Sequence, residues 1–423
     1  MRLPHALLIF LTIAAPEPAF AQVAAADSGD TGWMILCALL LLVAALPGLM
    51  LRHAGQVNVR SALSVMAQGA AVAAVASIVW ALAGYSLAYA PGGSWIGGGA
   101  NLLLANLGQL RDGLTVPESA FVLFQLGLAL IAACLPVGAV AERTPIGWWI
   151  AFTPLWLLLV YAPLAHAVWG GGWLAELGVM DFAGALSIHA LAGFSALALA
   201  LIVGRRREGG DAGHAPVLSL AGGALLWIGL SGAVGGWALG ATDDAATALL
   251  NHHFAACAGA LGWALLDKLL GGRSSATGIV SGALAGIAAI SASAALVGTG
   301  GAMLIGLTAA IISRIGAGAL SGRVDDGAGV FVIHGLGGAT GALLLPIFVL
   351  PLMGGVGFEA NITLTGALMS QLIGLVVVAL WALVGSAIAA LIVSVVIAMR
   401  VSPEAEAEGL DARQHGQQGW DFR

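Results

Sequence analysis

Long apolar stretches separated by short polar segments dominate this chain. A helix that crosses a bilayer needs about 20 apolar residues, and about eleven stretches meet that requirement. The predicted spans are Trp33–Leu51, Ala62–Ala88, Ala120–Val140, Ile146–Ala167, Phe182–Val203, Val217–Leu239, Leu249–Leu270, Ala276–Leu296, Ala302–Leu320, Val330–Met353 and Leu372–Met399. The pattern predicts an all-α polytopic membrane protein. An odd number of spans would place the two ends of the mature chain on opposite sides of the bilayer.

The first residues predict a processing signal rather than a further span. Arg2 precedes the apolar stretch Ala6–Ala15, which is too short to cross a bilayer, and Ala19–Ala21 matches a small-residue cleavage site. Such a signal is typical of bacterial export and leaves the mature N-terminus outside. The expected organisation is a signal peptide at 1–21, a membrane domain at 22–400 and a cytoplasmic tail at 401–423.

Basic residues between the spans fall almost entirely on one side. With the N-terminus outside, the inner segments hold Arg52, Arg60, Arg143, Arg205, Arg206, Arg207, Lys268, Arg273, Arg314, Arg323, Arg400, Arg413 and Arg423. The outer loops hold Arg111 alone. Because cytoplasmic loops are enriched in Lys and Arg, this asymmetry supports both the number of spans and their orientation.

Composition agrees with a membrane location and excludes several functions. Hydrophobic residues make up 60% of the 423 residues and charged residues 9%, against about 25% charged residues in soluble domains. An ordinary soluble enzyme and a nucleic-acid binder, which would need a basic surface, are therefore excluded. Cys37, Cys134 and Cys257 stand in apolar runs without metal-ligand spacing, so we expect no disulfide, metal or cofactor.

Two histidines inside apolar spans share the same surroundings. His189 in the fifth predicted span and His334 in the tenth both occur in the pattern I-H-x-L-x-G. Five spans followed by five more, each half ending on this pattern, predict an inverted repeat with the histidines facing each other near the midplane. A single histidine of this kind is more often bonded to a nearby carbonyl, but ionisable residues within spans are rare and usually functional.

Two facing imidazoles support a specific chemistry. Each neutral ring offers one donor and one acceptor nitrogen, so the pair can share one proton and still offer an outer nitrogen to a small guest. Apolar surroundings disfavour the charged form, and the rings are expected to stay largely neutral. The pair can therefore relay a proton or bind a small polar molecule.

Dispersed motifs, in order along nearly the whole mature chain, resemble the ammonium transporter (Amt/Mep/Rh) family. They are Gly84–Ala88, Gly138–Arg143, Tyr161–Gly172, Asp181–Gly184 leading to His189, Val330–Phe331 before His334–Gly335, and Glu408–Asp411 with His415–Gly416. The resemblance implies the ammonium-transporter fold: two inverted five-helix repeats plus a long last helix, assembled as a homotrimer with one pore per subunit.

The same resemblance assigns roles to individual residues. Trp169 and Phe124 would line an external ammonium site that Asp181 supports, and His189 and His334 would lie inside a narrow hydrophobic pore. For Asp181 the alternative is a helix N-cap, and for Trp169 it is an aromatic anchor at the membrane interface. The indole face can attract a cation at the mouth with about 0.5–2 kcal/mol, after which ammonia would cross as a neutral molecule.

The chain departs from the family at the pore mouth. The two gate phenylalanines are replaced by Leu128 and Ala233, and the serine that would bond external ammonium is replaced by Trp237, within Gly229–Trp237. An aspartate common before the second histidine is Gly329. Trp237 can refill the volume left by Ala233 and keep a π-face for the cation, or the changes can mark an altered rate, an altered substrate or a sensing role.

The leading hypothesis is therefore transport of ammonium or ammonia across a bacterial inner membrane, with the C-terminus in the cytoplasm. The alternatives are a non-conducting or slow ammonium sensor acting through a partner, and a pore for another small solute such as methylamine or carbon dioxide. The resemblance of the tail suggests regulation by a cytoplasmic PII-type signal protein, although Gln417 replaces an acidic residue common in the family.

Overall fold

The structure is a computed structural model that describes residues 25–207 and 213–420. The predicted signal peptide at 1–21 lies outside these residues. Within the described ranges the chain is almost entirely helical and forms no β-strand, apart from isolated bridges between Gly92 and Gly97 and between Leu110 and Pro117. The predicted all-α class is therefore confirmed.

The first half of the chain folds into helices that are repeatedly interrupted by short π-helical segments. In order they are α1 Ser28–Leu39, η1 Leu40–Ala45, α2 Leu46–Gly55, η2 Val59–Ser61, α3 Ala62–Val79, η3 Trp80–Gly84, α4 Tyr85–Tyr89, η4 Leu102–Leu104, α5 Glu118–Ala139, α6 Ile146–Trp156, η5 Leu157–Tyr161, α7 Ala162–Trp169, α8 Trp173–Glu176, η6 Ala185–Ala190 and α9 Leu191–Val203. The segments η1, η3, η5 and η6 are π-helical and continue directly into the following α-helix.

The second half contains longer uninterrupted helices and one further π-helical segment, η7. In order they are α10 Pro216–Gly236, α11 Asp243–Gly271, α12 Ala276–Ile290, α13 Thr299–Leu320, η7 Phe331–Gly335, α14 Leu336–Phe348, η8 Pro351–Met353, α15 Leu364–Ser394, α16 Pro403–Glu408 and α17 Leu410–His415. The last two helices form the tail.

Ten of the helical segments in the described residues are long and apolar enough to cross a membrane, and α12 is a shorter apolar helix. Together they occupy the eleven predicted positions. The eighth span was predicted to reach Leu296, but its helix ends at Ile290 because the carbonyls of Ser291 and Ala292 accept hydrogen bonds from the backbone N–H groups of Ala183 and Phe182. The last helix begins and ends earlier than predicted, at Leu364 and Ser394.

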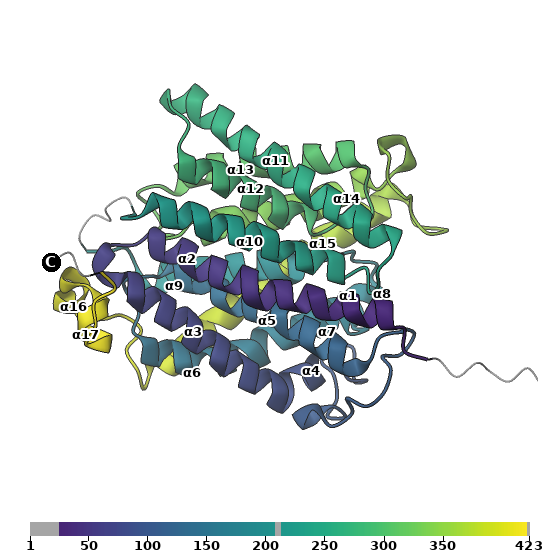
Figure 1. Ribbon diagram of the computed structural model, residues 1–423, viewed down its shortest axis with the longest axis horizontal. Coiled ribbons are helices and arrows are strands. Elements are labelled where there is room, and N and C mark those ends of the chain that lie inside the picture. Colours follow the sequence, from purple (N-terminus) through teal and green to yellow (C-terminus); the bar gives the residue numbers. More distant parts are fainter. Residues whose placement is uncertain (1–24, 208–212, 421–423) are drawn as a thin grey trace, which may run out of the picture.

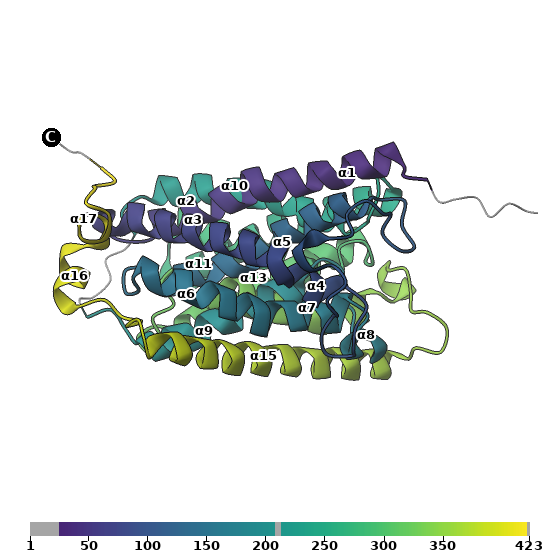
Figure 2. The ribbon, with the colours of Figure 1, turned by 90° about the horizontal axis from the view of Figure 1, so that it is seen from below.

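The spans run roughly parallel to one long axis. The start of α1 lies at one end of the molecule, and the tail helices α16 and α17 lie at the opposite end (Figures 1 and 2). In Figure 2 the long helix α15 borders one side of the bundle, while α1, α2 and α10 border the other. The described ends of the chain are therefore on opposite sides, as an odd number of spans predicts.

The two halves pack against each other reciprocally. Helix α9 of the first half contacts η7 of the second, and α14 of the second half contacts η6 of the first. The loop before η6 bonds to the end of α12 through Phe182 and Ala183, and the loop before η7 bonds in the same way to the end of α5, where Gly327 and Ala328 donate to the carbonyls of Ala139 and Gly138. This exchange is the arrangement that an inverted repeat produces.

Candidate functional site

The structure brings the two predicted histidines together. His189 lies in η6 and His334 in η7, and their Nδ1 atoms are 3.1 Å apart. The rings are nearly parallel, with centroids 5.1 Å apart, and the residues are 2% and 3% exposed. Single-turn π-helical segments occur frequently at functional sites, and of the five in the described residues η6 and η7 each carry a histidine.

A glycine four positions after each histidine permits this approach. A Cβ atom on Gly193 would lie 2.3 Å from the backbone of Gly335, and one on Gly338 would lie 2.3 Å from the carbonyl oxygen of Ala185. Both distances are too short for any side chain. The last letter of the I-H-x-L-x-G pattern therefore lets η7 cross α9, and α14 cross η6, closely enough for the imidazoles to meet.

The pairing geometry restricts the protonation of the rings. A contact between two Nδ1 atoms requires that one carries the proton and the other accepts it. If both rings are neutral, the donor ring has an acceptor at Nε2, and its partner has a donor N–H there. The two outer nitrogens are therefore chemically different at any moment. Their roles exchange only when the shared proton moves to the partner ring, the partner loses its Nε2 proton and the first ring gains one at its own Nε2.

An aspartate caps the helix that carries each histidine. Asp181 accepts hydrogen bonds from the backbone N–H of Ser187 at 2.8 Å and of Leu186 at 3.2 Å, and from the Ser187 hydroxyl at 2.8 Å. Asp326 accepts from the backbone N–H groups of Val330, Phe331 and Val332 at 2.8, 2.8 and 3.3 Å. The capping role considered for Asp181 is therefore present, and Asp326 is its counterpart.

Sequence reasoning missed Asp326, although a signal was available. Asp181 and Asp326 each precede their histidine in the pattern D-x-x-G-x-x-x-x-H, with the glycines at 184 and 329. Both glycines have positive φ, 98° and 69°, a conformation that glycine adopts most readily. Gly329, read in the sequence as the loss of an aspartate, thus occupies a backbone position that favours glycine, and Asp326 supplies the carboxylate.

Burial affects how the two capping carboxylates titrate. Burial raises the pKa of Asp181 to about 6, against the opposing effect of the Ser187 and Leu186 N–H donors. Burial likewise raises the pKa of Asp326 to about 6, against its three backbone donors. Each carboxyl therefore changes from neutral to negative as the pH rises through about 6. Each one is hydrogen-bonded to the helical segment that holds an imidazole.

The residues expected at the outer mouth also lie together. Trp169 donates its indole N–H to the backbone carbonyl of Asp181 at 2.8 Å. The ring of Trp237 contacts Trp169, with centroids 4.5 Å apart, and Phe124, with centroids 6.1 Å apart. Asp181 therefore contacts this aromatic group through its backbone, while its carboxylate is occupied by the cap.

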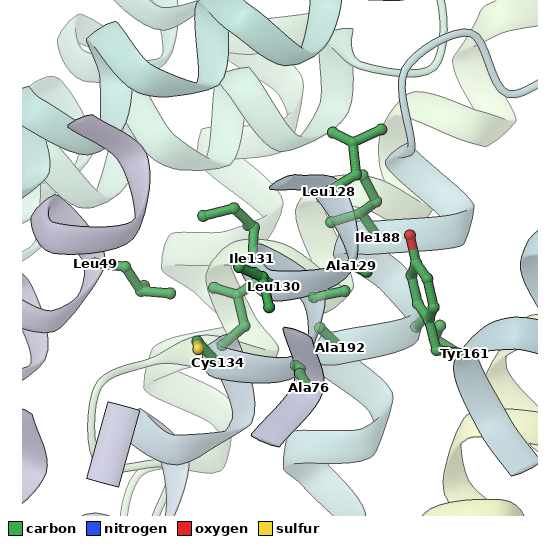
Figure 3. Packing of buried hydrophobic residues seen from close by; sticks show 14 of the residues in the cluster. Leu49, Ala76, Leu128, Ala129, Leu130, Ile131, Cys134, Tyr161, Ile188 and Ala192 are labelled. Atoms are coloured by element: carbon green, nitrogen blue, oxygen red, sulfur yellow. The ribbon is translucent and has the colours of Figure 1, made fainter. Parts of the chain in front are cut away.

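Leu128 and Ala233, which replace the expected gate phenylalanines, are buried in one hydrophobic cluster with Ile188, the neighbour of His189. Figure 3 shows Leu128 and Ile188 within this packing, with the side chain of Tyr161 beside them. Neither Leu128 nor Ala233 supplies an aromatic ring. The rings at this end come instead from Phe124, Trp169 and Trp237.

A polar cavity lies at the opposite end, beside η7. It has a volume of about 370 Å³, and its lining includes Arg205, Arg206, Asp325, Asp326 and Val332. Arg206 binds Asp325 through two nitrogens, at 2.8 and 2.9 Å, and Glu142 at 2.8 Å. Burial disfavours the ionised form of Asp325, but the Arg206 hydrogen bonds outweigh it and hold the pKa of Asp325 below its usual value.

A fully buried arginine joins the two halves beneath this cavity. Arg143 donates to the carbonyl oxygens of Gly204, Asp325 and Ala139. Burial lowers the pKa of Arg143 to about 10, so the guanidinium stays charged at neutral pH. It thus ties the end of α5 to the loop that carries Asp325 and Asp326.

The tail packs on the same end of the molecule. Arg400 pairs with Glu406 and donates to the carbonyls of Val203 and Arg205. Asp411 accepts from the backbone N–H groups of Leu63 and Ser64, near the start of α3. The predicted tail is therefore a docked segment rather than a free extension.

The comparisons with known proteins agree with the resemblance seen in the sequence. Residues 32–420 match the profile of the Ammonium Transporter Family. The putative ammonium transporter of Methanothermobacter thermautotrophicus is 37% identical over 402 residues, covering 93% of this chain and 98% of its own. The ammonium transporter of Bacillus subtilis is 34% identical over 400 residues, with the same coverage of the two chains.

Solved structures give the same picture. A protein titled Sensor Amt Protein superposes with a TM-score of 0.86 at 27% identity, covering 92% of this chain and 98% of that one. Mep2 of Candida albicans superposes with a TM-score of 0.82 at 30% identity, covering 90% and 87%. The fold predicted from the sequence is therefore confirmed by its likeness to these structures.

Proposed function

This chain belongs to the ammonium transporter family, and its relatives from Methanothermobacter and Bacillus are named transporters rather than enzymes; from that premise we propose that it moves ammonium or ammonia across a membrane past His189 and His334. The observation that carries the proposal is the 3.1 Å contact between the Nδ1 atoms of these two buried rings. It provides a polar station among buried apolar residues that include Ile188, Leu191 and Ile333.

The surroundings of the pair favour a neutral passenger. A charge at the bilayer centre costs at least about 2.5–3.5 kcal/mol. Arg52, which is buried and acts electrostatically on His334, further disfavours a cation at the pair. Ammonia has one lone pair and three N–H bonds, so it can accept from one outer Nε2–H and donate to the other Nε2. Ammonium, which has no lone pair, can use only the acceptor nitrogen.

In this mechanism the outer end collects the cation and the pair passes its neutral form. The faces of Phe124, Trp169 and Trp237 provide π-density at the mouth, worth about 0.5–2 kcal/mol to a cation. The proton that ammonium releases is either relayed through the imidazole pair or moves by a separate route. Asp181 acts through position, since its carboxylate holds η6 and its carbonyl fixes Trp169.

The test is an ammonium pulse on proteoliposomes containing the full chain, read as current and as internal pH. We expect a signal above that of empty liposomes, and we expect His189→Ala either to abolish it or to let the bare cation leak. Asp112→Ala is the control, since Asp112 is an exposed residue in the loop before α5 and stands outside the pair. No signal from the wild type would refute transport, and unchanged flux and selectivity in His189→Ala would refute the role of the pair.

A second candidate, an ammonium sensor, is favoured by two observations. The ring of Trp237 packs against both Phe124 and Trp169, and one similar structure is titled a sensor. A sensor would bind ammonium and change conformation without carrying current. Binding without flux in the same proteoliposomes would support this candidate.

We expect the protein to be a homotrimer in the bacterial inner membrane, with the tail in the cytoplasm. Helix α11 is only 33% buried over its most apolar window, and it exposes His253, which stacks on Trp227. An imidazole facing lipid is costly, which supports cover by a neighbouring copy. Basic residues gather around the tail, namely Arg143, Arg206 and Arg400, and this supports a cytoplasmic location for that end. The partner that we expect there is a PII-type signal protein.

A further inference from the structure

Arg52 is a buried arginine whose charge no carboxylate balances. The residue is 2% exposed and stands in the last turn of α2. Its Nη2 donates to the hydroxyl of Ser281 in α12 at 3.0 Å, while its Nη1 is buried without a hydrogen-bond partner among the described residues. No ion pair between described residues includes Arg52. Because an arginine side chain keeps its proton in proteins, the guanidinium is a fixed positive charge inside the bundle.

The other buried arginine, Arg143, is surrounded very differently. It donates to three carbonyl oxygens and lies 3.6 Å from a carboxylate oxygen of Asp325. Arg52 has a neutral hydroxyl and the carbonyl end of its own helix, where the helix dipole supplies only a fraction of a negative charge. A buried charge without a full counter-charge is costly to the fold, so its presence indicates a use.

The packing directs this charge toward one ring of the imidazole pair. A Cβ atom on Gly222 would lie 2.3 Å from the backbone nitrogen of Arg52, so α10 closes that side of α2 and the guanidinium extends to Ser281 on α12. Helix α12 in turn contacts η7, which carries His334, and Arg52 acts electrostatically on that ring. Helix α2 ends toward the tail (Figure 1). The charge therefore lies on the His334 side of the pair, remote from the aromatic group at the outer mouth.

Resting on the proposed function, we propose that Arg52 is a specificity-determining residue of the path, a cation barrier that ammonium passes only after releasing its proton. At an effective dielectric constant of about 20, a fixed positive charge about 8 Å away lowers the occupancy of a site by a cation about 30-fold. The barrier acts on every monovalent cation, including potassium, which is nearly the same size as ammonium. Size does not separate these two ions, but only ammonium can lose a proton and continue as a neutral molecule.

The first experiment measures potassium conductance in proteoliposomes that contain the full chain and no ammonium. Arg52→Met keeps an unbranched side chain without the charge, and we expect it to raise the potassium conductance at least about tenfold over the wild type. Arg60→Met, at an exposed arginine of η2, is the matched control and should leave the conductance unchanged. Equal potassium conductance in the wild type and Arg52→Met would overturn the cation barrier.

A second pair of variants separates the charge of Arg52 from its packing. Ser281→Asp places a carboxylate beside the guanidinium and neutralises it with the arginine retained, whereas Ser281→Asn has nearly the same shape and no charge. We expect Ser281→Asp to raise the potassium conductance and Ser281→Asn to leave it near the wild-type value. If Arg52→Met does not fold, this comparison decides, and equal conductance in the two variants overturns the barrier. A wild type that admits more potassium when chloride replaces gluconate would also overturn it, because a bound anion would then balance Arg52.

These outcomes are distinct from the outcome for transport itself. Raised potassium conductance in Arg52→Met and Ser281→Asp, with no ammonium-dependent signal in the wild type, would support the barrier and refute transport. An ammonium-dependent signal in the wild type, with potassium conductance unchanged in both variants, would support transport and refute the barrier.

Discussion

The close crossing of η6 and α14 makes a strong prediction about Gly338. In Gly338→Ala, the added Cβ would lie 2.3 Å from the carbonyl oxygen of Ala185, 2.9 Å from the backbone nitrogen of Ala190 and 3.2 Å from the Cβ of His189. Ordinary contact begins near 3.4 Å, so the helices must separate by about 1 Å. The Nδ1 atoms, now 3.1 Å apart, would then be about 4 Å apart, beyond hydrogen-bond distance.

Two measurements follow from that displacement. Overpacking of this kind costs about 1–3 kcal/mol, so the detergent-solubilised variant should unfold several degrees below the wild type. A displacement of 1 Å in a site can cost about 100-fold in rate, and we expect the ammonium-dependent current to fall at least about tenfold. Gly300→Ala is the control, since nothing lies within 4 Å of its Cβ position in α13. If Gly338→Ala kept full current and full thermal stability, the proposed role of the crossing would be wrong.

The capping aspartates give two further predictions. The pKa of Asp181 is about 6 in the fold and near 3.9 in an unfolded chain, so the native state binds the extra proton and the wild type loses stability as pH rises from 5 to 7. Asp181→Asn lacks this titration. Its melting temperature relative to the wild type should therefore rise between pH 5 and pH 7, by the equivalent of about 1 kcal/mol. A difference that does not depend on pH would contradict the raised pKa of the buried carboxyl. Asp326→Ala removes the acceptor for three N–H groups and should cost about 1–2 kcal/mol of stability. Thermal unfolding measures this loss against the control Asp112→Ala, at an exposed position. Equal melting temperatures for the two variants would contradict the capping role of Asp326.

Much of the fold could be predicted because membrane insertion leaves a strong signal. Span length follows from the thickness of the bilayer. The position of basic residues follows from their enrichment in cytoplasmic loops, and the repeated I-H-x-L-x-G pattern follows from the inverted repeat. The π-helical segments could not be predicted, because one extra residue in a turn leaves an apolar run equally apolar. The early end of α12 was missed for a related reason, since it depends on hydrogen bonds from Phe182 and Ala183, more than a hundred residues earlier.

The site was predictable in its members and less so in its arrangement. Sequence placed the histidines face to face because their surroundings repeat. It missed Asp326 because a capping carboxylate lies outside the apolar run and is recognised by spacing from the histidine. The position of Trp237 between two other rings depends on a rotamer set by tertiary packing, which no local pattern encodes.

The two ends of the path begin with the same local structure and differ in what surrounds it. In each half an aspartate caps a π-helical segment that follows a left-handed glycine, and the histidine of that segment meets its partner in the interior. The first copy, at Asp181 and His189, lies beside Trp169 and its aromatic neighbours, whose π-faces attract a cation. The second copy, at Asp326 and His334, lines a cavity whose lining includes no aromatic ring, and there Arg206 is paired with Asp325 and Glu142. The repeat thus supplies the geometry of the histidine pair, and under the proposed function the divergence of the two mouths favours capture of ammonium outside and release of neutral ammonia inside.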